Sequence, residues 1–130
     1  MAEALADTLS ANGLRLDGRL HAGRLTEVWR AVSREGAVVA VKTPAAPWSG
    51  HRGARLWLER EHRALGRLAH PRIVRAIDFL ERDGCVALVT EYLGGGDLVP
   101  LAGAAPAFWL DAAAGVAEAL AHVHERGYVH

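Results

Sequence analysis

The chain is nearly devoid of lysine. Among its fifteen lysine and arginine residues, Lys42 is the one lysine, and it follows the apolar run of residues 38–41. An ammonium group is a compact point charge, whereas a guanidinium is a wide planar fork, so the two cations are not interchangeable. A cation at the end of a buried strand also needs an anion to meet. We therefore expect Lys42 to hold a place that an arginine could not fill.

Cysteine is scarce, and neither sign of charge is in excess. Cys85 is the single cysteine, which excludes an intrachain disulfide and fits a reducing compartment. The formal net charge of the 130 residues is zero, so no basic excess calls for a nucleic acid or an anionic membrane surface. Residues 1–11 lack both the basic segment and the apolar core of a signal peptide. These absences predict a soluble cytoplasmic domain that contacts neither nucleic acid nor membrane.

No uninterrupted hydrophobic run is long enough to suggest a membrane span. The most apolar long stretch, residues 101–123, contains Pro106, Asp111 and Glu118, and charged residues within a span are costly. Beyond Pro106 the spacing instead predicts a helix that is apolar around nearly its whole circumference and that needs a cover. We expect Gly127 to cap its carboxyl end.

Turn signals divide the chain up to Thr90 into short β-rich runs. The Asp83-Gly84 pair is a strong hairpin signal, and three consecutive glycines, residues 94–96, separate this part from an alanine- and leucine-rich helical part. The expected strands are residues 14–20, 27–32, 37–43, 76–80 and 85–90, with one helix over residues 54–68 and another beyond Pro106. The predicted fold class is α+β.

The helix over residues 54–68 offers an anion to Lys42. Glu61 falls on the same stripe as Leu58 and Leu65, at helical spacings of three and four. A buried carboxylate and a buried ammonium each need a partner, so Glu61 and Lys42 would satisfy each other. The alternative is that Glu61 lies at the edge of the stripe and reaches solvent.

Five segments, in order, resemble the protein kinase family, and in particular the bacterial Ser/Thr kinases of the eukaryotic-like type. Residues 39–42 (Val-Ala-Val-Lys) are similar to the lysine strand of the family, and residues 61–65 are similar to its glutamate helix. Residues 70–74 (His-Pro-Arg-Ile-Val) are similar to the HPNIV segment. Residues 88–98 are similar to the hinge between the lobes, and residues 124–130 to the helix end before the catalytic loop.

The resemblance covers residues 14–130 and implies a domain organisation. Residues 1–13 would be an N-terminal extension. Residues 14–93 would form the kinase N-lobe and hinge, a five-stranded antiparallel sheet with one long helix. Residues 94–130 would begin a helical C-lobe that is truncated.

The resemblance implies ATP binding and transfer of the γ-phosphoryl group to a hydroxyl of a protein substrate. Lys42 would contact the α- and β-phosphates, and Glu61 would hold it there; these two are the implied catalytic residues. The implied nucleotide-binding residues are Leu20, Gly23, Val28, Ala40, Lys42, Thr90, Glu91, Leu93 and Asp97.

Each nucleotide-binding residue has a specific role in this resemblance. Val28 and Ala40 would enclose the adenine; the alternative for these small apolar residues is ordinary strand packing. The backbone of Glu91 and Leu93 would bond to the adenine edge. In addition, Thr90 stands at the gatekeeper position, and Asp97 would reach the ribose.

The chain departs from the family pattern in two places. The Gly-rich loop aligns with residues 21–28, where only Gly23 and Val28 match, so this loop would bind phosphates poorly or by a different backbone path. The chain also ends at His130, the first residue of the H-R-D motif. The metal-holding acids and the catalytic aspartate would lie downstream, so we expect Mg²⁺ only with them and no phosphate transfer by these 130 residues.

Three functions stay open on this reasoning. The chain is part of an active Ser/Thr kinase, part of a pseudokinase or nucleotide-binding scaffold, or part of a small-molecule phosphotransferase of the aminoglycoside type. No metal site is expected from the histidines, because His122 and His124 are two apart on a helix and point to different sides.

Overall fold

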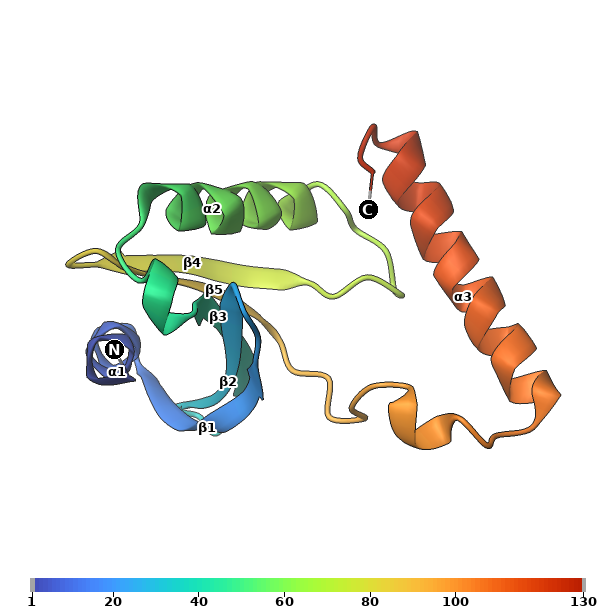
Figure 1. Cartoon of the computed structure of the whole chain (residues 1–130), viewed down its shortest axis with the longest axis horizontal. Coiled ribbons are helices and arrows are strands. Elements are labelled where there is room, and N and C mark those ends of the chain that lie inside the picture. Colours follow the sequence, from blue (N-terminus) through green and yellow to red (C-terminus); the bar gives the residue numbers. More distant parts are fainter. Residues whose placement is uncertain (1, 130) are drawn as a thin grey trace.

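The computed structural model describes residues 2–129 and contains one five-stranded antiparallel sheet (Figure 1). Its strands run in the order β1-β2-β3-β5-β4. Each predicted strand is present, and its ends fall within two residues of the expected ones. The bounds are β1 Leu14–Ala22, β2 Thr26–Ser33, β3 Val38–Pro44, β4 Ala76–Arg82 and β5 Cys85–Glu91. The α+β fold with a kinase-like N-lobe sheet is therefore confirmed.

The β4–β5 hairpin turns at the residues that the sequence indicated. Asp83 and Gly84 have φ values of 49° and 82°. Two successive positive φ values are those of a type I′ turn, which matches the twist of the paired strands. This hairpin places β5 beside β3, and in the register of these two strands Lys42 lies opposite Leu88.

The first helix, α1 (Ala2–Ala11), was not predicted. Leu5 and Leu9 are 1% and 0% exposed and pack against Ala31, Val41 and Val89 of the sheet. The two leucines lie one helical turn apart, but two leucines in so short a segment are a weak periodic signal. The domain boundary at residue 13 stays a prediction, although α1 completes the core on this face.

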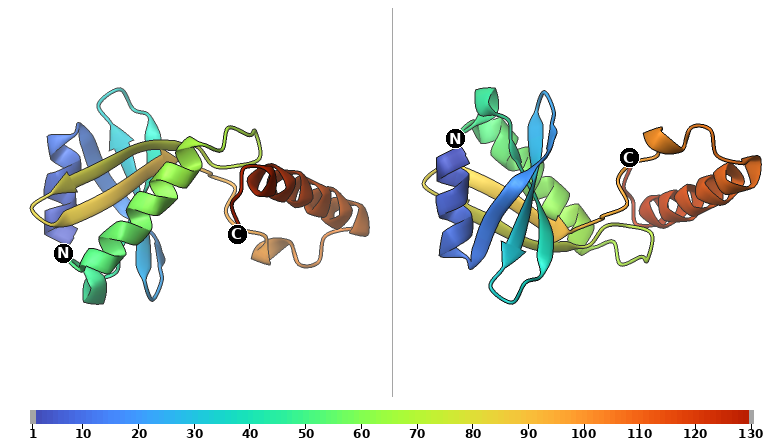
Figure 2. Two further views of the ribbon diagram at one scale, coloured as in Figure 1. Left: turned by 90° about the horizontal axis from the view of Figure 1, so that it is seen from above. Right: turned by 90° about the horizontal axis from the view of Figure 1, so that it is seen from below.

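Helix α2 (Arg52–Gly66) covers the other face of the sheet, so the sheet lies between α1 and α2 (Figures 1 and 2). It begins and ends two residues earlier than predicted. Its beginning is set by His51, whose Nδ1 accepts a hydrogen bond of 3.0 Å from the Gly53 N–H. The second core cluster lies below α2, where Leu58 packs against Val86 and Leu88.

Beyond β5, the chain passes through a short 3₁₀ turn, η2 (Val99–Leu101), into helix α3 (Pro106–Glu125). The end of α3 is as predicted: Gly127 has φ 82° and its N–H donates to the His124 carbonyl, while the Tyr128 N–H donates to the Val123 carbonyl. This pair of bonds is a Schellman cap, and only glycine takes the required conformation freely.

Helix α3 projects away from the sheet (Figure 2). It meets the rest of the chain through the segment after α2, where Arg72 pairs with Glu118 at 3.0 Å and the rings of His70 and His122 lie 5.1 Å apart. Several of its apolar side chains are exposed, Leu110 to 73%, whereas Leu120 and Val123 are partly buried. Within residues 2–129, no helix is both long and apolar enough to cross a membrane.

Candidate nucleotide-binding site

Lys42 and Glu61 form the ion pair that the sequence predicted. The Lys42 Nζ lies 3.0 Å from each carboxylate oxygen of Glu61. Strand β3 supplies the lysine and the middle of α2 supplies the glutamate. The pair is less buried than expected, because the lysine and glutamate side chains are 33% and 40% exposed. The alternative that Glu61 reaches solvent is thus correct in part: it touches solvent and Lys42 together.

Strand register places several predicted residues on the same face as Lys42. Val28 lies opposite Lys42 in the β2–β3 ladder, and Thr90 lies opposite Ala40 in the β3–β5 ladder. Alternate residues of a strand share a face, so Val28, Ala40, Lys42 and Thr90 form one surface. Val39 and Val41, between them, point to the opposite face and join the core below α1. The side chains of Val39 and Val41 therefore lie on the opposite face of the sheet from the Lys42 side chain.

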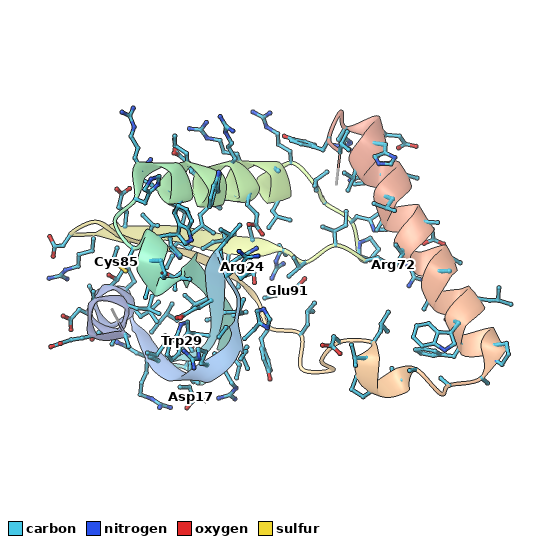
Figure 3. All side chains as sticks on the ribbon, in the orientation of Figure 1. Asp17, Arg24, Trp29, Arg72, Cys85 and Glu91 are labelled. Atoms are coloured by element: carbon cyan, nitrogen blue, oxygen red, sulfur yellow. The ribbon has the colours of Figure 1, made fainter. Side chains whose placement is uncertain are left out.

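The backbone at the end of β5 is partly engaged. Glu91, labelled in Figure 3, donates its N–H to the Arg75 carbonyl at 3.0 Å, and its side chain accepts a bond of 2.8 Å from the Arg75 N–H. Its own carbonyl accepts a bond of 3.2 Å from the Thr90 hydroxyl, and a carbonyl oxygen has a second lone pair for a ligand. Leu93, two residues later, is 65% exposed and makes no hydrogen bond to residues 2–129. Of the two backbone positions implied for adenine, Leu93 thus keeps its N–H unused, and the Glu91 carbonyl keeps its second lone pair.

Asp97 lies on the exposed connection after the hinge. One of its carboxylate oxygens accepts a 2.9 Å bond from the Val99 N–H, at the beginning of η2. The ribose contact predicted for Asp97 stays a prediction. Sequence reasoning missed this local turn contact, in which the Asp97 carboxylate binds the backbone N–H two residues later, as aspartate side chains commonly do.

The hairpin between β1 and β2 is closed tightly at Gly23. The Gly23 N–H donates to the Thr26 carbonyl at 2.9 Å. A Cβ atom at residue 23 would lie 2.8 Å from that carbonyl oxygen, so glycine is required for packing. The loop tip is further tied by a bond of 2.9 Å from the Ala45 N–H to the Leu25 carbonyl. This geometry uses the Gly23 N–H inside the loop; whether the loop binds phosphates poorly or by a different backbone path stays a prediction.

The carboxylates near this face each have a partner within the chain. Glu61 is bound by Lys42, Glu91 by the Arg75 N–H and Asp97 by the Val99 N–H. Magnesium needs oxygen ligands held in octahedral geometry. In the part of the chain that the structure describes, no group of three or more His, Cys, Asp or Glu side chains is placed to hold a metal ion. His130, expected to begin the H-R-D motif, lies outside the described residues.

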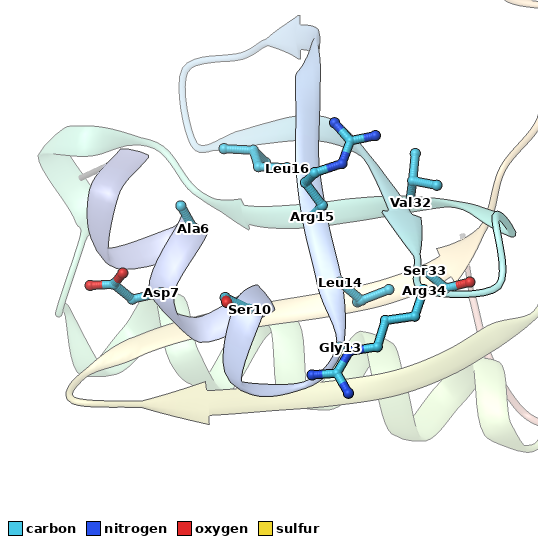
Figure 4. A pocket seen from close by; sticks show the side chains of 10 residues that line it. All are labelled: Ala6, Asp7, Ser10, Gly13, Leu14, Arg15, Leu16, Val32, Ser33 and Arg34. Carbon is cyan, nitrogen blue, oxygen red and sulfur yellow. The ribbon is translucent and has the colours of Figure 1, made fainter.

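Two large hollows lie on the surface of the chain. An apolar groove of about 830 Å³ runs between α2 and α3, lined by Leu65, Ile73, Val116 and Leu120, with Glu61 also in its lining. The other, of about 700 Å³, lies where α1 meets β1 and the end of β2 (Figure 4). It contains none of the residues predicted to bind nucleotide.

Comparisons with known proteins agree with this geometry. The family described as protein kinase domain matches residues 15–130. Human dual specificity testis-specific protein kinase 1 is 32% identical over 117 residues, which cover 86% of this chain and 18% of that protein.

Among solved structures, the kinase domain of Mycobacterium tuberculosis PknI is similar to this chain. The unsubstituted domain has a TM-score of 0.69 at 26% identity, and the match covers 91% of this chain and 50% of that one. A point mutant of the same domain has a TM-score of 0.70 at 26% identity, covering 91% and 51%. The chain spans about half the length of these kinase domains. On its sequence match and its fold, the chain belongs to the protein kinase family.

Proposed function

We propose that the chain is the ATP-binding part of a protein serine/threonine kinase. The observation that carries this proposal is the Lys42–Glu61 ion pair, with both carboxylate oxygens 3.0 Å from the ammonium. The ammonium shares its sheet face with Val28 and Ala40. A fixed cation beside a small apolar surface fits a ligand that has a flat base and a chain of phosphates.

Each residue contributes through its own chemistry. The Lys42 ammonium offsets the negative charge of the α- and β-phosphates, and Glu61 fixes its direction. Val28 and Ala40 are small enough to let the adenine ring lie against the strands, while Leu20, 46% exposed, closes the side of the site. Thr90 limits access behind the base.

The remaining groups set the orientation of the nucleotide. The Glu91 carbonyl and the Leu93 N–H bond to the edge of the adenine, and the second carboxylate oxygen of Asp97 reaches the ribose. Gly23 lets the hairpin lie close to the phosphates, but its N–H is already bonded to Thr26. Charge compensation at the phosphates therefore depends more on Lys42 than on this loop.

The acceptor of the phosphoryl group is proposed to be a serine or threonine hydroxyl of a protein. The support is the resemblance to bacterial Ser/Thr kinases and the structural likeness to the PknI kinase domain. The human relative is a dual specificity kinase, so tyrosine is the second candidate acceptor. Phosphoamino-acid analysis of a protein substrate treated with the full-length protein distinguishes them.

These 130 residues are proposed to bind nucleotide without transferring phosphate. The carboxylates nearest the site are engaged by Lys42, Arg75 and Val99. The tight closure of the hairpin at Gly23 favours a nucleotide-binding scaffold as the second candidate function for the whole protein. In the full-length protein, incorporation of labelled phosphate into a protein substrate decides between a kinase and such a scaffold.

Nucleotide binding is tested by thermal unfolding with increasing ATP. A ligand at one hundred times its dissociation constant stabilises the folded state by about 2.7 kcal/mol, so the melting temperature of the wild type should rise. Lys42→Ala should lose most of this rise, and Lys42→Arg should restore little of it because guanidinium has a different shape. Arg60→Ala, an exposed arginine on α2, is the matched control. No rise for the wild type at millimolar ATP would refute the proposal.

A further inference from the structure

Arg30 lies beside the proposed adenine site, on a strand position that the kinase resemblance leaves without a role. In the register of β2, Arg30 is opposite Ala40 of β3 and opposite Gly18 of β1. It is two residues after Val28, so it shares the face that carries Val28 and Ala40. Its side chain is 33% exposed, which leaves most of it in contact with the protein.

The guanidinium of Arg30 has two partners from different parts of the chain. It forms an ion pair with the carboxylate of Asp17 on β1, and its central carbon lies 5.7 Å from the centre of the Tyr92 ring. That distance is within the range of a cation–π interaction. Arginine suits both contacts because its planar fork bonds in its plane and stacks on a ring with its face.

The backbone of β1 directs Asp17 towards this contact. The ladder between β1 and β2 shifts register between Leu16 and Gly18, so Asp17 is the extra residue of a bulge. A bulge turns a side chain away from its regular direction and increases the local twist. Asp17, labelled in Figure 3, lies on the same strand that continues into the Gly23 hairpin.

Tyr92 belongs to the hinge. It directly follows Glu91, the last residue of β5, and precedes Leu93, whose N–H is unused. Through Arg30, the hinge is therefore connected to β2 and, through Asp17, to β1. The connection therefore joins two parts of the proposed site. Strands β1 and β2 would face the flat side of the adenine, and the hinge would bond to its edge.

We propose that Arg30 is a positioning residue of the nucleotide site: together with Asp17 and Tyr92 it sets the distance between the hinge and the β1–β2 strands. This inference rests on the proposed nucleotide site and assigns Arg30 no contact with the ligand. We expect Arg30 to affect the binding of the adenine base and not that of the phosphates, because the phosphates are bound by Lys42, which lies further along the strands. Loss of the connection should weaken any ligand that contains adenine by the same factor.

The chain contains a matched control on the same hairpin. Arg19 also combines a carboxylate and an aromatic ring: its guanidinium is 3.7 Å from Glu27 and lies 5.8 Å from the centre of the Trp29 ring. Both of those partners are on β2, so Arg19 reaches no residue of the hinge. Comparing Arg30 with Arg19 separates the connection to Tyr92 from a general effect of removing a half-exposed arginine.

The experiment measures binding of adenosine and of ATP to the whole chain by isothermal titration calorimetry. Arg30→Met keeps the apolar stem but removes the charge and the planar group, and Tyr92→Leu removes the ring. Each should weaken both ligands about two- to five-fold, the change expected from the loss of one cation–π contact. Arg30→Met also removes the ion pair with Asp17 and should lie at the upper end of this range. The double variant should bind no more weakly than Arg30→Met alone, since that change already removes the contact with Tyr92. Arg19→Met should bind both ligands like the wild type.

Different failures are distinguishable. If the wild type binds and Arg30→Met binds equally well, the inference is wrong while the proposed function stands. Equal losses in Arg30→Met and Arg19→Met would also overturn it, as would a loss confined to ATP, which is expected instead of Lys42→Ala. If the wild type binds neither ligand, the proposed function fails and this inference fails with it. Should Arg30→Met not fold, Tyr92→Leu measures the same connection from the hinge, with Tyr92→Phe expected to match the wild type.

Discussion

Truncation of Leu9 to alanine tests whether α1 is an integral part of the sheet domain. Leu9 is 0% exposed and packs, with Leu5, against the face of the sheet opposite α2. The kinase resemblance begins only after α1, so the family match says nothing about this helix. A large loss of stability in Leu9→Ala would mean that the domain depends on residues 2–11.

The size of the loss follows from burial. Replacing leucine by alanine removes three carbon atoms, worth about 2.4 kcal/mol at 0.8 kcal/mol for each buried methylene. The unfilled cavity adds to this, and measured values for such changes range from about 2 to 5 kcal/mol. We expect about 3 kcal/mol, a large fraction of the roughly 5–15 kcal/mol that stabilises an ordinary domain.

Urea unfolding followed by tryptophan fluorescence measures the change. With a denaturant slope of about 1.5 kcal/mol per molar, a loss of 3 kcal/mol lowers the midpoint by about 2 M. Ser10→Ala is the control, because Ser10 is exposed on the same helix and should change the stability by less than about 0.5 kcal/mol. A loss below about 1 kcal/mol for Leu9→Ala would refute the packing of α1 as described.

Three further predictions concern stability. Gly23→Ala brings a Cβ within 2.8 Å of the Thr26 carbonyl oxygen and should cost about 1–3 kcal/mol in urea unfolding; an unchanged midpoint would mean that the hairpin relaxes freely. Thr43→Val removes a buried hydroxyl that donates to the Val86 carbonyl at 2.8 Å and should cost about 1–3 kcal/mol, whereas Thr43→Ser should cost less. The hydrogen bonds from Arg55 hold the pKa of Glu81 below its ordinary value, so this stabilisation is complete above that value and is lost as the pH falls through the lowered pKa. Glu81→Gln should therefore lower the midpoint at neutral pH and reduce its fall in acid; an acid profile like that of the wild type would contradict the assignment.

Much of the fold was predictable because the signals are local. The Asp83-Gly84 pair determines its turn through the positive φ values that such residues accept, and Gly127 ends α3 for the same reason. Helix α1 was missed because two leucines in a short segment are a weak periodic signal. Its identity as a core element depends on contacts with Ala31 and Val89, which lie far away in the sequence.

The candidate site was predictable in its members and less so in its environment. The lysine strand and the glutamate stripe were enough to pair Lys42 with Glu61. Helical spacing indicates on which side of the helix Glu61 lies but not how deeply its side chain is buried. The 40% exposure of that side chain could therefore not be predicted. The connection from Arg30 to Asp17 and Tyr92 was also out of reach, because it depends on a bulge in β1.

The sequence by itself determined the order of the five strands and of helices α2 and α3, indicated the family, and offered Glu61 as the partner of its one lysine. These depend on residue type and spacing along the chain. The tertiary structure decided that α1 completes the core, that the Lys42–Glu61 pair is half-exposed, and that the Gly23 N–H is already engaged. It also placed Arg30 between the hinge and β1. Such facts depend on the distances between segments that are remote in sequence, and strand register and packing set those distances.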